Sequence, residues 1–191
     1  MKQLHLLYMV MIALTIISIS AALHASQIST VACRLDMNIQ TTSYGPEGSS
    51  IEIEPEIIAY MNDTITVAVV AQGVTDLDTY QVEIQFDPQS LKFIKGYEDV
   101  PSLGIQNVLK SSGGTTIGFM AFEKTPGTIN IANALVGKNT HQAPDGSGIL
   151  AVLRFKVLSD KTSELVLKNI YFVDSNKKQC VVTQKFGGKI K

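Results

Sequence analysis

Residues 80–86 alternate between apolar and polar side chains, and this short segment constrains the fold of the chain more than any other. The apolar positions are Tyr80, Val82, Ile84 and Phe86, and the polar positions are Gln81, Glu83 and Gln85. Successive side chains of a strand point to opposite faces, so the pattern predicts a strand with one buried and one solvated face. The strand should end at Asp87-Pro88, because proline cannot donate to a sheet ladder.

Similar strand-length runs, separated by turn residues, follow one another from residue 50 to the end of the chain. The predicted strands cover residues 50–54, 64–71, 79–86, 91–97, 106–110, 115–121, 128–134, 148–158, 164–173 and 180–184. No segment keeps a 3.6-residue apolar period, which argues against helices in the core. The spacing of runs and turns therefore predicts an all-β fold, a nine- to ten-stranded antiparallel β-sandwich.

The first 25 residues form an apolar run in which Lys2 is the only charged side chain, histidines aside. This composition predicts a signal peptide over residues 1–25, with an uncleaved membrane anchor as the alternative. Residues 26–48 show no period and are rich in turn formers, so they are expected to be an N-terminal linker. The sandwich domain is then expected over residues 49–191, in a secreted or envelope protein.

The predicted strand at 148–158 has an unusual second face. Ile149, Ala151, Leu153, Phe155 and Val157 form one side of it, and Leu150, Val152, Arg154 and Lys156 form the other. The second side is half apolar, whereas a solvent face is normally polar. Either the protein's own N-terminal segment or a loop covers it, or a partner does.

The sequence offers little to an active site. His141 is the only histidine outside the leader, and it lies in a polar loop away from any nucleophile motif. Asp76, Asp78, Asp145 and Asp174 lie in turns, where carboxylates commonly cap backbone N–H groups. We therefore expect no catalytic residues, no metal site and no enzyme activity. The chain has 17 acidic and 16 basic side chains and no basic patch, which argues against nucleic acid as a partner.

The two cysteines, Cys33 and Cys180, leave three alternatives open. In a secreted chain they can form a disulfide between the N-terminal segment and the last strand. They can equally be two unpaired thiols. A third alternative makes Cys33 a lipid-modified residue, although the residues before it match such a motif poorly.

Residues 49–190 resemble a cohesin domain, the extracellular module that receives dockerin domains. The residues that carry the resemblance lie, in order, at 62–69, 73–77, 80–93, 146–157, 173–176 and 187–190. They are similar to the early Gly-Asp-x-Val-x-Val-x-Val strand of the family, its Tyr-Asp-Pro-x-x-Leu segment, its Gly-x-Leu-x-x-Ile-x-Phe-x-Val strand and its closing Asp-x-Asn turn. The match runs through nearly the whole chain that follows the linker.

The resemblance implies a jelly-roll sandwich and a non-catalytic interaction module that docks a dockerin-like partner. It also implies that one sheet face, built partly from residues 80–86 and 148–158, receives this partner. The partner-binding residues implied are Thr79, Gln81, Glu83, Gln85, Leu150, Val152 and Arg154. Calcium is expected on the dockerin rather than on this chain, which needs no cofactor. A carbohydrate-binding module, with polysaccharide as its ligand, and a structural or adhesive envelope protein are the alternatives.

Overall fold

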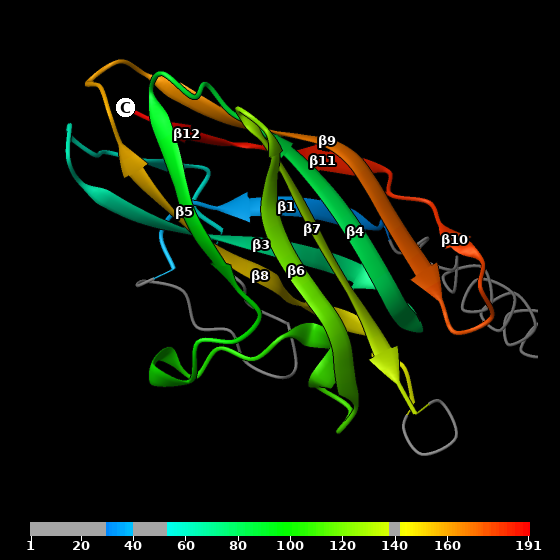
Figure 1. Cartoon of the computed structure of the whole chain (residues 1–191). Helices are drawn as coiled ribbons and strands as arrows, with labels where there is room; N and C mark the ends of the chain where they lie inside the picture. The colour runs from blue at the N-terminus through cyan, green and yellow to red at the C-terminus, as the bar shows by residue number, and fades with distance from the viewer. Residues whose placement is uncertain (1–29, 40–52, 138–141) are drawn as a thin grey trace, which may run out of the picture.

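The computed structural model describes residues 30–39, 53–137 and 142–191. The strands in these ranges form two sheets packed face to face, which confirms the predicted β-sandwich (Figure 1). Among the described residues, no helix is long and apolar enough to cross a membrane. The predicted leader at residues 1–25 lies outside the described residues.

One sheet has five strands in the order β11-β1-β3-β8-β5. Their bounds are β11 Gln184–Phe186, β1 Ala32–Asp36, β3 Thr64–Val74, β8 Gly146–Val157 and β5 Leu91–Tyr97. The pairings are antiparallel except for β1 with β11, which run parallel. We call this layer the five-stranded sheet.

The other sheet has seven strands, six of them in the order β2-β12-β9-β4-β7-β6, with β10 also paired to β9. Their bounds are β2 Glu56–Ile57, β12 Gly188–Ile190, β9 Ser163–Asp174, β4 Leu77–Gln85, β7 Thr128–Val136, β6 Thr115–Thr125 and β10 Gln179–Cys180. Strands β2 and β12 run parallel, and the other pairs are antiparallel. We call this layer the seven-stranded sheet.

The main core lies between the sheets and is built by the alternation read in the sequence. Tyr80, Val82 and Ile84 of β4 have no exposed surface. Phe155 of β8 faces them from the other sheet and packs edge-to-face against Phe86, with 5.4 Å between ring centroids. Burial of such large apolar side chains is the main stabilising contribution of the sandwich.

Gly96 lets the two sheets approach each other at the β5–β6 side. A Cβ atom added at Gly96 would lie 2.3 Å from the Cβ atom of Ala121, far inside van der Waals contact. Only glycine therefore fits where the five-stranded sheet meets β6 of the seven-stranded sheet.

Several sequence expectations about local structure are wrong. The predicted strand at 180–184 is instead the ends of two short strands, β10 and β11, with no strand at residues 181–183. Residues 26–48 are not only a linker, because β1 lies within them and Cys33 and Leu35 are part of the main core. The predicted strand at 106–110 is instead a short 3-10 helix, η2, at Val108–Lys110. The Asn107 side chain caps it by accepting a hydrogen bond from the backbone N–H of Leu109, a local contact that favours a turn over a strand.

Candidate functional site

The four predicted site residues of β4 lie together at the centre of the seven-stranded sheet, between β9 and β7. Gln81 and Gln85 are exposed, and Thr79 and Glu83 are half-buried. Because their neighbours along β4 point into the core, these four side chains lie on the outer face of the sheet. The expected solvated face of this strand is therefore formed.

The three predicted site residues of β8 do not join that face. Strand β8 lies between β3 and β5 in the five-stranded sheet, on the opposite layer of the sandwich. The expectation that residues 80–86 and 148–158 build one sheet face is therefore wrong. Leu150 and Val152 have no exposed surface with which to contact a partner, and only Arg154 is exposed.

A bulge in β8 and a cover over the sheet explain why Leu150 and Val152 are buried. Val69 pairs with Ala151 and Val70 with Ile149, so Leu150 is the extra residue, and it packs in the main core. Val152 instead belongs to a second cluster on the outside of the five-stranded sheet. That cluster also contains Ile39, Ala68, Val70, Ile105 and Ile149, with Ile53, Tyr97 and Val100 packed against it.

The half-apolar outer face of β8 is thus covered by the protein itself. Ile39 comes from the N-terminal segment and Ile53 from the chain just before β2, and Val100 and Ile105 come from the loop between β5 and η2. Of the two alternatives left open by the sequence, cover by the protein's own segments is confirmed.

A buried polar network holds this loop in place. Asn107 has no exposed surface, and its Nδ2 donates to the Tyr80 hydroxyl at 2.8 Å and to the Leu150 carbonyl at 2.6 Å. Tyr80 also donates to the Leu150 carbonyl. Burial raises the pKa of Tyr80 well above its usual range, so its hydroxyl stays protonated and continues to donate.

The outer face of the seven-stranded sheet carries apolar residues that the sequence reading missed. On β6, the exposed fractions of Ile117, Met120 and Phe122 are 62%, 48% and 45%, and Tyr171 on β9 is 46% exposed. Ile117, Met120 and Phe122 follow one another along β6 and form an apolar patch of the kind found at binding surfaces, whereas Tyr171 lies apart from them, beyond β7 and β4.

The register places these residues in rows with the polar residues of β4. One row is Met120, Ala132, Gln81 and Tyr171, and a second is Phe122, Asn130 and Glu83. In a third row, Ile117 pairs with Ala134, which pairs with Thr79. We call these residues, together with Gln85 and Asn169, the seven-stranded face.

The polar side chains of this face are only partly engaged within the protein. Glu83 accepts a hydrogen bond of 3.2 Å from Asn169 on β9, whereas Gln81 is exposed between Ala132 on β7 and Tyr171 on β9. The face therefore has apolar side chains on both sides of a polar strip, and can bind another protein surface through both kinds of contact.

The turn carboxylates singled out in the sequence do not form a metal-binding cluster in the described part of the chain. No group of three or more His, Cys, Asp or Glu side chains there could hold a metal ion. Asp145 accepts from the Asp76 backbone N–H at 2.7 Å, and Asp76 accepts from the Ser175 hydroxyl at 2.5 Å. These carboxylates cap turns, as their positions in the sequence indicated. His141 lies outside the described residues.

Cys33 and Cys180 are both free thiols in the structure, so the disulfide alternative is not formed. Burial raises the pKa of Cys33 to about 12. Burial, together with the carboxylates of Asp174 and Asp76, also raises the pKa of Cys180. A protonated thiol is a poor nucleophile, so neither cysteine is suited to covalent chemistry.

Comparison with known proteins gives a family and several structural neighbours. The family model of the cohesin domain matches residues 56–190. A search of curated protein sequences finds no match. Among solved structures, the sixth cohesin of scaffoldin B from Acetivibrio cellulolyticus, determined in complex with a dockerin, is 15% identical with a TM-score of 0.59. The alignment covers 84% of this chain and 97% of that one.

Two further neighbours come from other organisms. The cohesin CaCohA2 from Clostridium acetobutylicum is 20% identical, with a TM-score of 0.57 and coverage of 84% and 90%. A non-cellulosomal cohesin from the hyperthermophilic archaeon Archaeoglobus fulgidus is 13% identical, with a TM-score of 0.55 and coverage of 84% and 89%. At such identities these structures establish the fold alone, whereas the family model covers most of the chain. The chain belongs to the cohesin domain family.

Proposed function

We propose that the protein is a non-catalytic interaction module that binds a dockerin-type domain through the seven-stranded face. The observation that carries the proposal is the exposed apolar side chains on either side of the polar strip of β4, with Tyr171 on the neighbouring strand β9 and Ile117, Met120 and Phe122 on β6, beyond β7. Neighbouring cohesins were solved in complex with dockerins, which supports a partner of this class.

The binding residues in this proposal differ from the set implied by the sequence. Thr79, Gln81, Glu83 and Gln85 remain, because β4 presents them on the seven-stranded face. Leu150 and Val152 are withdrawn because they are buried, and Arg154 because it belongs to the other sheet. The residues of β6 and Tyr171 take their place.

The apolar side chains should contribute most of the affinity, because desolvated aromatic and aliphatic anchors dominate protein interfaces. The polar strip should fix the orientation of the partner. Calcium is expected to hold the partner's own loops rather than to bind this chain. A location outside the cytoplasm, secreted or attached to the cell surface, follows from the apolar leader at residues 1–25.

The test immobilises the protein and exposes it to the secreted and envelope proteins of the source organism, with and without EDTA. Capture of a protein with paired calcium-loop motifs, lost in EDTA, is the expected result. Phe122→Asp should reduce that capture at least about tenfold, because one aromatic anchor commonly accounts for more than about 1.4 kcal/mol.

The matched control is Val181→Asp, which places the same charge at a position that is 74% exposed, outside the seven-stranded face. It should leave capture unchanged. Equal capture by wild type and Phe122→Asp would remove the seven-stranded face as the docking site. Retention on polysaccharide without any calcium-dependent protein partner would instead favour the carbohydrate-binding alternative.

A further inference from the structure

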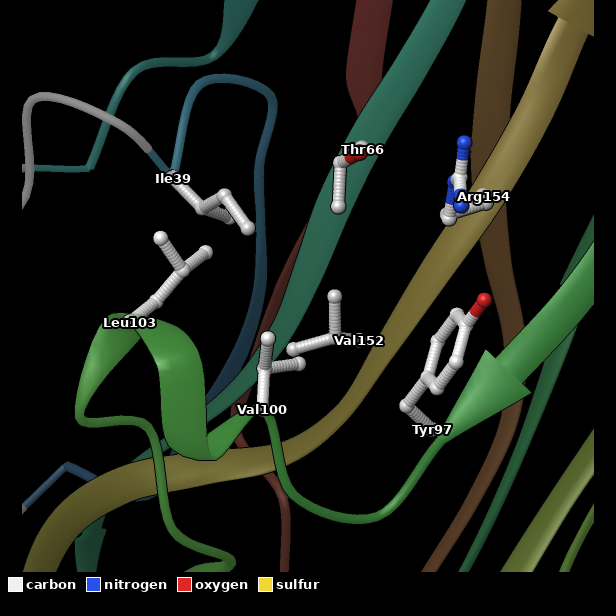
Figure 2. Close-up of a pocket in the computed structure, with 7 residues that line it drawn as sticks. All are labelled: Ile39, Thr66, Tyr97, Val100, Leu103, Val152 and Arg154. Carbon is white, nitrogen blue, oxygen red and sulfur yellow. The ribbon is translucent and has the colours of Figure 1, made fainter.

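A groove of about 330 Å³ lies on the outside of the five-stranded sheet, on the layer opposite the proposed docking face. Its lining residues are Ile39, Thr66, Tyr97, Val100, Leu103, Val152 and Arg154. Figure 2 shows Ile39 and Leu103 at one end of the groove and Tyr97 and Arg154 at the other. A groove of this volume accommodates one or two large side chains of a ligand.

The lining of this groove is mainly aliphatic. Val152 lies beneath the floor with no exposed surface of its own, so the apolar walls that a ligand can touch are Val100 and Leu103, from the segment that follows β5. Leu103 is 53% exposed, although its side chain is apolar and lies at the rim of the groove. An aliphatic lining fits an apolar side chain better than a sugar, which needs aromatic platforms and many hydrogen-bonding groups.

Four cations lie next to the groove on two adjacent strands. Lys92 on β5 pairs with Lys156 on β8, and Lys95 on β5 pairs with Arg154 on β8. Like charges directly opposite each other destabilise a sheet. In the described parts of the chain, the ion pairs are formed by Lys110, Lys177 and Lys191, and none of these four cations takes part in one.

Protection of a sheet edge explains only half of this cluster. Strand β5 is an edge of the five-stranded sheet, and lysines on edge strands discourage pairing with other chains. Arg154 and Lys156, however, lie on β8, which is paired on both sides. Edge protection therefore does not account for these two charges.

The cations and the groove lie in consecutive rows of one register. The first row is Lys92 with Lys156 and the second is Lys95 with Arg154. The third is Tyr97 with Val152, both of which line the groove. Consecutive rows lie two residues apart along β8, or about 7 Å for a strand rising about 3.3 Å per residue. An extended peptide places every second side chain on one side at the same spacing.

We propose that this surface binds an extended acidic peptide segment of a partner protein, with the order acidic, any, acidic, any, apolar. The two acidic side chains would meet the two cationic rows, and the apolar side chain would enter the groove at the third. The proposal does not depend on the docking function, because it uses the opposite sheet.

The test measures fluorescence anisotropy of a labelled peptide that carries aspartate, serine, aspartate, serine and phenylalanine in this order. The control peptide has the same composition with the phenylalanine placed between the aspartates. The ordered peptide should bind several-fold more tightly, and its affinity should fall as salt rises. Equal binding of the two peptides would overturn the proposed register.

Protein variants locate the peptide on the surface. Reversing two cations, Arg154→Glu with Lys156→Glu, should weaken binding about tenfold, since each exposed ion pair accounts for up to about fivefold. The charge-matched control, Lys124→Glu with Lys168→Glu, changes exposed lysines of the seven-stranded sheet and should have little effect. If the two double variants weakened binding equally, the effect would be one of net charge alone, and the site would be refuted.

Two further measurements complete the test. Leu103→Ser should remove the preference for the ordered peptide while leaving its salt dependence. Binding of polygalacturonate without binding of the peptide would overturn the peptide assignment in favour of an acidic polysaccharide. Calcium-dependent partner capture should survive Arg154→Glu with Lys156→Glu, so failure of this proposal and failure of the docking proposal can be told apart.

Discussion

Replacing Asn107 by alanine should destabilise the protein strongly, although the residue lies in a loop. Its side chain makes three hydrogen bonds: to the Tyr80 hydroxyl, to the Leu150 carbonyl and from the Leu109 N–H. Each buried hydrogen bond stabilises the folded protein by about 1 kcal/mol, and a buried donor left without a partner destabilises it by about 1–3 kcal/mol. In Asn107→Ala, the Leu109 N–H loses its partner, whereas the Leu150 carbonyl keeps the Tyr80 hydroxyl. We therefore expect a loss of about 3–5 kcal/mol.

Equilibrium unfolding in urea, followed by circular dichroism, measures this loss. Thermal unfolding of the same proteins should show a midpoint temperature lower by about 6–20 °C, since 1 kcal/mol corresponds to about 2–4 °C in a domain of this size. The control is Tyr80→Phe, which leaves the Asn107 bonds to Leu150 and Leu109 in place and should cost only about 1–2 kcal/mol.

The double variant distinguishes a network from independent contacts. Because Asn107 and Tyr80 are bonded to each other at 2.8 Å, the two losses should overlap by about 1 kcal/mol or more. Strict additivity, or a loss below about 1 kcal/mol for Asn107→Ala, would refute the reasoning that this network pins the loop. In that case the loop would be held by its apolar contacts alone.

Two other variants test burial and ionisation. Val152→Asp should cost about 4 kcal/mol or more, because it places an unpaired carboxyl where the side chain has no exposed surface, and thermal unfolding will show this directly. A stability close to that of wild type would mean that the cover over β8 opens readily. Burial raises the pKa of Cys33 in the folded protein to about 12, from an ordinary value of 9.0. Its thiol ionises first in the unfolded chain, so stability should be lost as pH rises from about 9 to about 12, by up to about 1.4 kcal/mol per unit. Cys33→Ala, measured in urea at the same pH values, should lack this part of the pH dependence, and an identical slope in both proteins would show that Cys33 is not buried.

The sequence was sufficient to predict the sandwich, because period-two alternation directly reports a half-buried strand. It did not reveal to which sheet each strand belongs, because a strand such as β4 or β8 shows the same alternation whichever of the two sheets it joins. Strand β1 carried a usable signal: Cys33, Leu35 and Met37 alternate with the polar residues Arg34 and Asp36. The turn-rich residues that follow masked it.

The apolar part of the seven-stranded face was hidden for a different reason. In a regular strand, Ile117 and Phe119 share one side and Met120 lies on the other. A register shift between Ile117 and Met120 changes this, and Gly118 adopts the left-handed conformation with φ 79° at that point. Both Ile117 and Met120 then lie on the outer face, which a reading of simple alternation cannot anticipate.

The pairing of the first strands with the last has a consequence for the order in which the chain folds. Ala32 of β1 pairs with Gln184, and Glu56 of β2 pairs with Lys189. A ribosome adds about 5–20 residues per second, so these strands wait for many seconds before their partners exist. Contacts between such distant residues also slow folding itself. The sandwich therefore cannot close before residues 184–190 have been synthesised.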